Sequence, residues 1–206
     1  MSARDGHGIR WVLFDWGNVL VDYRPIGFVR LAEHVGTPLD DMVEALGARK
    51  MVRQLCVGEA SPGALCDFIL ERFGASITPD DVMSMFVDDV RTRLPDTERL
   101  VSALRSRYRL SILSNTFFGH WHELLRDPFY RVFEHPMASH LLGLEKPDPR
   151  IYQHALSTLG AAPNEVVFVD DKLENITAAR ELGLHAIHAP TRAETWAGLR
   201  ALGCLY

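Results

Sequence analysis

The sequence has few cysteines, no long uncharged apolar run and no excess of basic residues. Its three cysteines, Cys56, Cys66 and Cys204, follow no metal-binding spacing, which favours a reducing compartment. The polar residues 1–8 lead directly into an apolar run and do not have the pattern of a signal peptide. No uncharged stretch approaches the roughly 20 residues of a membrane-spanning helix. We therefore expect a cytoplasmic protein with no membrane partner.

The charge balance narrows the classes of partner. The chain of 206 residues has 22 Lys and Arg against 27 Asp and Glu, a formal net charge of −5. This balance argues against a nucleic-acid partner, which would require a basic face. It is compatible with a small anionic substrate, because a bound cation and a few local bases can reverse the field in a cleft. With 47% hydrophobic residues, the chain can build one large domain or a core with a smaller appendage.

Short apolar runs predict the strands of a sheet. They lie at residues 9–14, 110–113, 166–169 and 184–187, and they are rich in Val, Ile and Leu without clean alternation, as strands buried on both faces are. Residues 135–139 are a weaker candidate because Pro136 interrupts them. Amphipathic helices separate the runs; one begins at Asp148-Pro149 and another ends at Gly183. Strands alternating with helices predict an α/β fold with a doubly wound, Rossmann-like parallel sheet.

One segment breaks this alternation. Residues 23–92 predict only helices, at 26–35, 40–46, 62–73 and 79–91. A helical insertion after the first strand would form a cap over the crevice of the sheet, where such lids exclude water and select substrate. We therefore predict a core domain from residues 1–22 and 93–206 and a helical cap domain from residues 23–92. The basic cluster Arg49, Lys50 and Arg53, with Gln54, is a candidate for contact with substrate.

Polar side chains follow three of the predicted strands. Asp15, Ser114 and Asp170 each come directly after an apolar run, and Lys146 lies in a turn before Pro147. The carboxyl ends of parallel strands share one edge of a sheet, which would gather these residues. Taken singly, each residue also fits an ordinary structural role, such as a strand end, a helix cap or a loop. Together they supply a carboxylate nucleophile, a hydroxyl and an ammonium for an anion, and carboxylates for Mg²⁺.

Four motifs in this order resemble those of the haloacid dehalogenase superfamily, in the subfamily I branch with a helical cap between the first two motifs. They are Asp15-Trp16-Gly17-Asn18, Leu113-Ser114-Asn115, Glu145-Lys146-Pro147 and Val169-Asp170-Asp171. The resemblance implies a nucleophilic Asp15 that passes through an aspartyl-phosphate. It also implies that Ser114 and Lys146 hold the phosphoryl oxygens. Mg²⁺ would be bound by Asp15, Asp170 and the carbonyl of Gly17.

Three neighbouring residues complete the predicted site. Asp171 would bind Mg²⁺ through water or orient Lys146. Asn115, with Ser114 and Lys146, is a candidate for phosphate binding. Trp16, directly after the nucleophile, would form a wall of the pocket. The predicted function is a Mg²⁺-dependent phosphatase that acts on a small phosphorylated metabolite, as a monomer or homodimer.

One position departs from the pattern. Phosphatases of this superfamily usually carry a second aspartate two residues after the nucleophile, as a general acid and base, and here that position is Gly17. General acid–base help contributes about 10² to 10⁴ in rate, so its loss favours leaving groups that tolerate negative charge. Anomeric sugar, aryl and acyl phosphates fit this requirement. The stretch Leu142-Gly143-Leu144-Glu145-Lys146-Pro147 adds a resemblance to bacterial α-D-glucose-1-phosphate phosphatases, which implies a sugar 1-phosphate as substrate. Candidates for a replacement proton donor are Asp22, His120, His122 and His140.

Two alternatives are compatible with the same motifs. A metal-independent 2-haloacid dehalogenase would also use Asp15, but Asp170 and Asp171 would then repel an anionic substrate unless a cation were bound. A non-catalytic regulator that binds a phosphorylated metabolite would explain Gly17, but it would have no need of a nucleophile directed at phosphorus.

Overall fold

The structure, a computed structural model, describes residues 8–206 and contains a parallel sheet of five strands. The order across the sheet is β3-β2-β1-β4-β5, so the first strand lies at the centre. The strands span Trp11–Phe14 (β1), Arg109–Ser114 (β2), Met137–Ala138 (β3), Val166–Asp170 (β4) and His185–His188 (β5). The predicted doubly wound parallel sheet is therefore confirmed.

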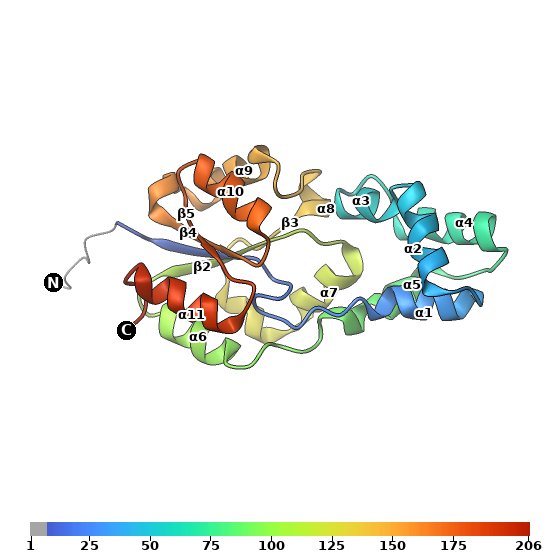
Figure 1. Ribbon diagram of the computed structural model, residues 1–206, viewed down its shortest axis with the longest axis horizontal. Helices are drawn as coiled ribbons and strands as arrows, with labels where there is room; N and C mark the ends of the chain where they lie inside the picture. Colours follow the sequence, from blue (N-terminus) through green and yellow to red (C-terminus); the bar gives the residue numbers. More distant parts are fainter. Residues whose placement is uncertain (1–7) are drawn as a thin grey trace.

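Helices cover both faces of the sheet (Figure 1). In β1, Val12 and Phe14 pack with α6, α7 and α11, whereas Trp11 and Leu13 pack with α9 and α10. All four side chains are fully buried, which explains why this strand is a continuous apolar run. The covering helices span Thr97–Leu104 (α6), Phe118–Arg126 (α7), Pro149–Leu159 (α9), Leu173–Glu181 (α10) and Arg192–Ala201 (α11).

The first five of the six α-helices between β1 and β2 lie beside the sheet and have a buried apolar cluster of their own (Figure 1). The cluster is separate from the two that flank the sheet, although Phe117, just before α7, also belongs to it. The helices span Ile26–Val35 (α1), Leu39–Ala48 (α2), Met51–Cys56 (α3), Pro62–Phe73 (α4) and Pro79–Val87 (α5). The sequence signals act as expected at several ends. Ser61 caps α4, Thr78 and Asp81 form a capping box on α5, and Gly36 ends α1 at φ 69°.

The structure differs from the sequence predictions in a few elements. The weak strand at 135–139 is reduced to the two residues of β3, and α8 (Ser139–Leu142) follows it at once. The helix predicted at 79–91 stops at Val87 and continues as a 3₁₀ turn, η1 (Asp88–Val90). Helix α3 was not predicted as a helix. Two further 3₁₀ turns are η2 (Pro128–Val132) and η3 (Pro163–Glu165). Among the described residues, no helix is both long and apolar enough to cross a bilayer.

Candidate active site

The predicted site residues come together at the carboxyl ends of three adjacent strands. Asp15 directly follows β1, while Ser114 and Asp170 are the last residues of β2 and β4. Phe14 pairs with Ile112 on one side and with Val169 on the other, so β1 brings Asp15 between the two neighbouring strand ends. Strands β2 and β3 lie on one side of β1, and β4 and β5 lie on the other, so the strand order switches direction at β1. Parallel α/β sheets bind ligands at such a switch point.

Lys146 links the nucleophile candidate to β4. Its Nζ donates to Asp15 Oδ1 at 2.7 Å and to Asp170 Oδ2 at 2.6 Å. The Lys146 side chain is 1% exposed and that of Asp170 is fully buried, so both charges depend on this pairing. The ammonium also lies 5.3 Å from the centre of the Phe168 ring, which faces it from the strand. Lys146 therefore forms an ion pair with both carboxylates at once.

Asn115 fixes the backbone of the loop that carries Lys146. Its Nδ2 donates to the Lys146 carbonyl at 2.8 Å, and its Oδ1 accepts from the Lys146 N–H at 2.8 Å. Both ends of the amide are thus engaged with one residue, and the next peptide bond, Lys146-Pro147, is cis. Asn115 lines the same cavity as Ser114. Its amide is hydrogen-bonded to the Lys146 backbone, so the contact of Asn115 shown here is one that positions Lys146.

Three carboxylates form a cluster that suits a hard divalent cation. Oxygen atoms of Asp15, Asp170 and Asp171 all lie within 4.8 Å of one another. Asn175 Nδ2 donates to both oxygens of Asp170, at 2.9 and 3.0 Å, and Asn18 Nδ2 donates to Asp171 at 3.1 Å. Carboxylate oxygens are the ligands that Mg²⁺ prefers, and the three carboxylates, when all are ionised, carry more negative charge than Lys146 alone can balance. The donor set therefore fits the predicted ion.

Burial and charge shift the titration of the two central groups. Burial raises the pKa of Asp15 to about 7, with Lys146 opposing the shift and Asp170 and Asp171 adding to it. Burial alone would lower the pKa of Lys146, but Asp15 and Asp170 outweigh it and raise that pKa. Lys146 is therefore an ammonium throughout the neutral range. The neighbouring carboxylates repel one another, and Lys146 is the cation that offsets this repulsion.

The remaining predicted residues line the same cavity, which measures about 630 Å³. Trp16 is in its wall, but the indole is only 2% exposed and its Nε1 donates to the Tyr130 hydroxyl at 3.0 Å, so most of this side chain belongs to the core. Gly17 lines the cavity next to Tyr23. The full lining is Asp15, Trp16, Gly17, Asn18, Tyr23, Phe28, Val52, Arg53, Cys56, Val90, Ser114, Asn115, Thr116, Phe117, His120, Glu145, Lys146, Asp171, Lys172 and Asn175.

The inserted helices reach this cavity through α1 and α3. Arg53 Nε pairs with Glu145 Oε1 at 3.0 Å, which joins α3 to the loop that carries Lys146. Gly58 lies against α8 so closely that an added Cβ would come 2.2 Å from the His140 carbonyl oxygen. Of the basic cluster noted in the sequence, Arg53 lines the cavity, whereas Arg49 pairs with Glu71 within the inserted helices.

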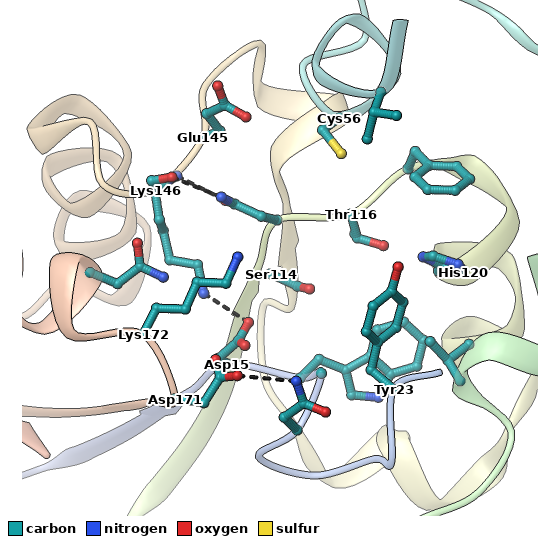
Figure 2. Close-up of a pocket in the computed structure, with 18 of the residues that line it drawn as sticks. Asp15, Tyr23, Cys56, Ser114, Thr116, His120, Glu145, Lys146, Asp171 and Lys172 are labelled. Atoms are coloured by element: carbon teal, nitrogen blue, oxygen red, sulfur yellow. Dashed lines mark hydrogen bonds and ion pairs between the residues drawn. The ribbon is translucent and has the colours of Figure 1, made fainter. Parts of the chain in front are cut away.

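Several cavity residues were missed by the sequence reasoning or only weakly indicated. Tyr23, Thr116 and His120 line the cavity away from Asp15, Asp171 and Lys146 (Figure 2), and Asp89, which does not line it, pairs with His120. Only His120 was named among the candidate proton donors. The three other candidates do not line the cavity: Asp22 pairs with Arg24, His122 is exposed, and His140 faces the Thr116 carbonyl. The weak signal for Thr116 was its place directly after the strand-end motif.

Comparison with known proteins gives a family match and similar folds. The model of the haloacid dehalogenase-like hydrolases matches residues 9–183. The sesquiterpene phosphatase astK of Aspergillus oryzae is 28% identical over 201 residues, covering 93% of this chain and 96% of that protein.

Two solved structures resemble the fold over most of its length. A predicted hydrolase of this family from Porphyromonas gingivalis is 26% identical, with a TM-score of 0.78, covering 94% of this chain and 98% of the other. A family enzyme from Bacteroides thetaiotaomicron in complex with magnesium is 25% identical, with a TM-score of 0.74, covering 87% of this chain and 92% of the other.

Proposed function

Because the chain belongs to the haloacid dehalogenase-like hydrolases, we propose that it is a Mg²⁺-dependent phosphoric monoester hydrolase acting on a small phosphorylated metabolite. The observation that carries the proposal is the position of Lys146, whose Nζ contacts both Asp15 and Asp170 while Asp171 completes an acidic cluster. The contacts support the proposal because they bring the proposed nucleophile, the proposed phosphate-binding cation and the proposed metal ligands into one small volume. The magnesium-bound structure and the curated phosphatase among the relatives support the same reading.

The proposed reaction has two steps. A carboxylate oxygen of Asp15 attacks phosphorus, and the bond between phosphorus and the ester oxygen breaks to release the leaving group. Water then attacks the aspartyl-phosphate, which releases inorganic phosphate and restores Asp15. Lys146 and the hydroxyl of Ser114 hold the phosphoryl oxygens throughout. Asp15, Asp170, Asp171 and the Gly17 carbonyl would hold Mg²⁺. The ion would neutralise the negative charge of the phosphate, which otherwise repels the nucleophile.

Gly17 limits the leaving groups that this site handles well. Without a carboxylate at that position, the departing oxygen has to leave with more of its negative charge. Anomeric sugar phosphates and aryl phosphates tolerate this better than simple alkyl esters. A sugar 1-phosphate is therefore the proposed type of substrate, in line with the resemblance of the segment 142–147 to glucose-1-phosphate phosphatases.

The inserted helices are proposed to act as a cap, with residues 23–92 as the cap domain and residues 1–22 and 93–206 as the core domain. Phe28, Val52 and Cys56 of this segment line the cavity, and Arg53 ties it to Glu145 of the core. A cap seated in this way would keep bulk water from the aspartyl-phosphate. The free state of all three cysteines supports a reducing, cytoplasmic location.

Phosphate release from a panel of esters tests the function. The panel contains 4-nitrophenyl phosphate, glucose 1-phosphate and glucose 6-phosphate, each with Mg²⁺ and with a chelator. We expect release that requires Mg²⁺ and favours the 1-phosphate over the 6-phosphate. Asp15→Asn should remove nearly all turnover, while Asp67→Asn, at an exposed position on α4, should behave as the unaltered protein.

The same experiment separates the alternatives. Release of halide from 2-chloropropionate in the presence of chelator, without phosphate release, would identify a dehalogenase. Binding of phosphate esters with no turnover would indicate a regulator. Equal turnover by the Asp15→Asn variant would rule out the aspartyl-phosphate route.

A further inference from the structure

Thr116 carries a buried hydroxyl with no hydrogen-bond partner in the described part of the chain. The residue is 2% exposed and lines the candidate active-site cavity two positions after Ser114. Its backbone is held firmly: the Thr116 N–H donates to Ser139 Oγ at 2.9 Å, and its carbonyl accepts from the same hydroxyl at 3.0 Å. Buried polar groups are nearly always paired, so an unpaired hydroxyl in a cavity wall is available to hydrogen-bond with a molecule in the cavity.

A buried hydrogen bond orients a second polar group beside it. Asp89 is fully buried; its Oδ2 lies 3.1 Å from His120 Nε2, and its Oδ1 accepts from the Gly27 N–H at 2.7 Å. A carboxylate can only accept here, which assigns the Nε2 proton to the histidine. The other ring nitrogen, Nδ1, makes no hydrogen bond to any residue that the structure describes, and the tautomer with its proton on Nε2 leaves Nδ1 free to accept one. The ring lines the cavity.

Tyr23 brings a third polar atom to the same place. Its ring lies edge-on to His120, with 5.8 Å between ring centres. Burial, with Asp89 and Cys56 adding to it, raises the pKa of Tyr23 to about 12, so the phenol keeps its proton and can donate. Figure 2 shows the Tyr23 and Thr116 hydroxyls and the His120 imidazole pointing toward one another, away from the group formed by Asp15, Asp171 and Lys146.

Apolar side chains line the same cavity as these three groups. Phe28 and Val52 come from the inserted helices, Val90 lies at the end of η1, and Phe117 comes from the start of α7. The Phe117 ring packs against His120, with 4.3 Å between ring centres. A ligand that occupies this part of the cavity therefore meets polar partners at one point and apolar surface elsewhere.

We propose that Tyr23, Thr116 and His120 form a subsite that binds a hydroxyl group on the leaving group of the substrate. The substrate hydroxyl donates to His120 Nδ1, and its oxygen, which has two lone pairs, accepts from the hydroxyls of both Tyr23 and Thr116. The inference rests on the proposed phosphatase function, because the acidic cluster defines where the phosphate lies. It narrows the substrate to phosphate monoesters whose leaving group presents one hydroxyl to these three residues and an apolar face, such as that of a sugar or aryl ring, to the rest of the subsite.

Binding of matched phosphonates tests the subsite without relying on turnover. The pairs are 3- and 4-(hydroxymethyl)benzylphosphonate against 3- and 4-ethylbenzylphosphonate, in which the hydroxyl replaces a methyl of similar size. Affinities are measured by calorimetry with Mg²⁺ present. We expect the hydroxymethyl compound to bind roughly tenfold more tightly in at least one pair, the size of one well-made hydrogen bond. Thr116→Val and Tyr23→Phe should each reduce that preference to threefold or less.

A matched variant and a parallel assay keep the outcomes distinct. Thr158→Val, at an exposed position on α9, should retain the full preference. Equal affinity within both pairs, no binding by any of the phosphonates, or a preference that survives both Thr116→Val and Tyr23→Phe would overturn the subsite. Phosphate release from 4-nitrophenyl phosphate is measured alongside. Release without a hydroxyl preference contradicts the subsite alone, whereas a preference without release supports the subsite and contradicts the phosphatase function.

Discussion

The Cβ of Tyr23 lies 3.5 Å from the point that a Cβ on Gly17 would occupy. This is ordinary van der Waals contact, and Gly17 is not among the residues with a positive φ. Neither the backbone nor the neighbouring ring therefore requires glycine at this position. The absence of a carboxylate two residues after Asp15 is a chemical feature of this chain that its fold does not impose.

Gly17→Asp should accordingly broaden the range of leaving groups. A carboxylic acid at this position can protonate a departing alkoxide. General acid catalysis of this kind contributes a factor of about 10² to 10⁴ to the rate. We expect kcat/KM for a simple alkyl phosphate to rise at least tenfold relative to 4-nitrophenyl phosphate, whose leaving group needs no proton. Gly17→Asn, of the same size without the acid, is the control. An equal change of this ratio in the two variants would show that size alone is responsible.

Asn115→Ala should impair activity through Lys146. The two hydrogen bonds between the Asn115 amide and the Lys146 backbone would be lost, and the Lys146 N–H and carbonyl would need new partners. We expect a free energy of unfolding lower by about 1–3 kcal/mol and a kcat reduced about tenfold. Urea unfolding and steady-state kinetics measure the two effects. Asn164→Ala, at an exposed position in η3, should change neither, and an unchanged kcat in Asn115→Ala would contradict the positioning contact.

Lys146→Met should destabilise the chelator-treated protein. The substitution leaves Asp15 and Asp170 facing each other without their shared cation, and loss of one partner from a buried pair costs about 3–5 kcal/mol. Mg²⁺ should recover part of this loss, because the proposed metal site brings the same carboxylates together in the folded state alone. Urea unfolding with chelator and with Mg²⁺ measures both. Lys172→Met, on an exposed side chain, is expected to shift stability by less than about 0.5 kcal/mol. Equal stability of the two variants would refute the buried pairing.

Cys56 should react slowly with iodoacetamide in the folded protein. Burial, with Glu145 adding to it and Lys172 opposing, raises the pKa of the Cys56 thiol from 9.0 to about 11. The thiolate is the reactive form, so at pH 8 its population should be about a hundredfold smaller than for a thiol with the unshifted value. The rate, followed by mass spectrometry, should rise about tenfold per pH unit from 8 to 10, and urea-unfolded protein should react much faster. A rate that levels off near pH 9 would contradict the half-buried position of Cys56 in the cavity wall.

The fold was largely predictable because its signals are local. The buried strands β1 and β4 are continuous apolar runs, and Ser61 and Thr78 mark helix starts within a few residues of chain. The short edge strand β3 and the six-residue α3 were less clear, since neither is long enough to show a period. In both cases packing against neighbouring elements, which the local sequence does not contain, decides the conformation.

The candidate site divides in the same way. Asp15, Ser114 and Asp170 could be grouped because the carboxyl ends of parallel strands share an edge. The pairing of Asp89 with His120 could not, because 31 residues separate them and neither carries a motif. The roles of amide and indole groups also depend on direction. Asn115 faces the Lys146 backbone and the Trp16 Nε1 faces Tyr130, and no spacing rule in the sequence specifies either direction.

The position of Asp89 affects how the protein could be engineered. One buried carboxylate accepts from the Gly27 N–H at the start of α1 and holds His120 on α7, so it joins the inserted segment to the sheet-packing helices at the substrate pocket. The Phe86 ring packs so closely on Gly27 that an added Cβ would come 2.2 Å from it, which leaves room for no other residue there. A chimaera that received a foreign segment at residues 23–92 would lose this carboxylate and the orientation of His120 with it. Transferring substrate preference between such proteins by exchanging this segment therefore requires Asp89, Gly27 and His120 to be kept together.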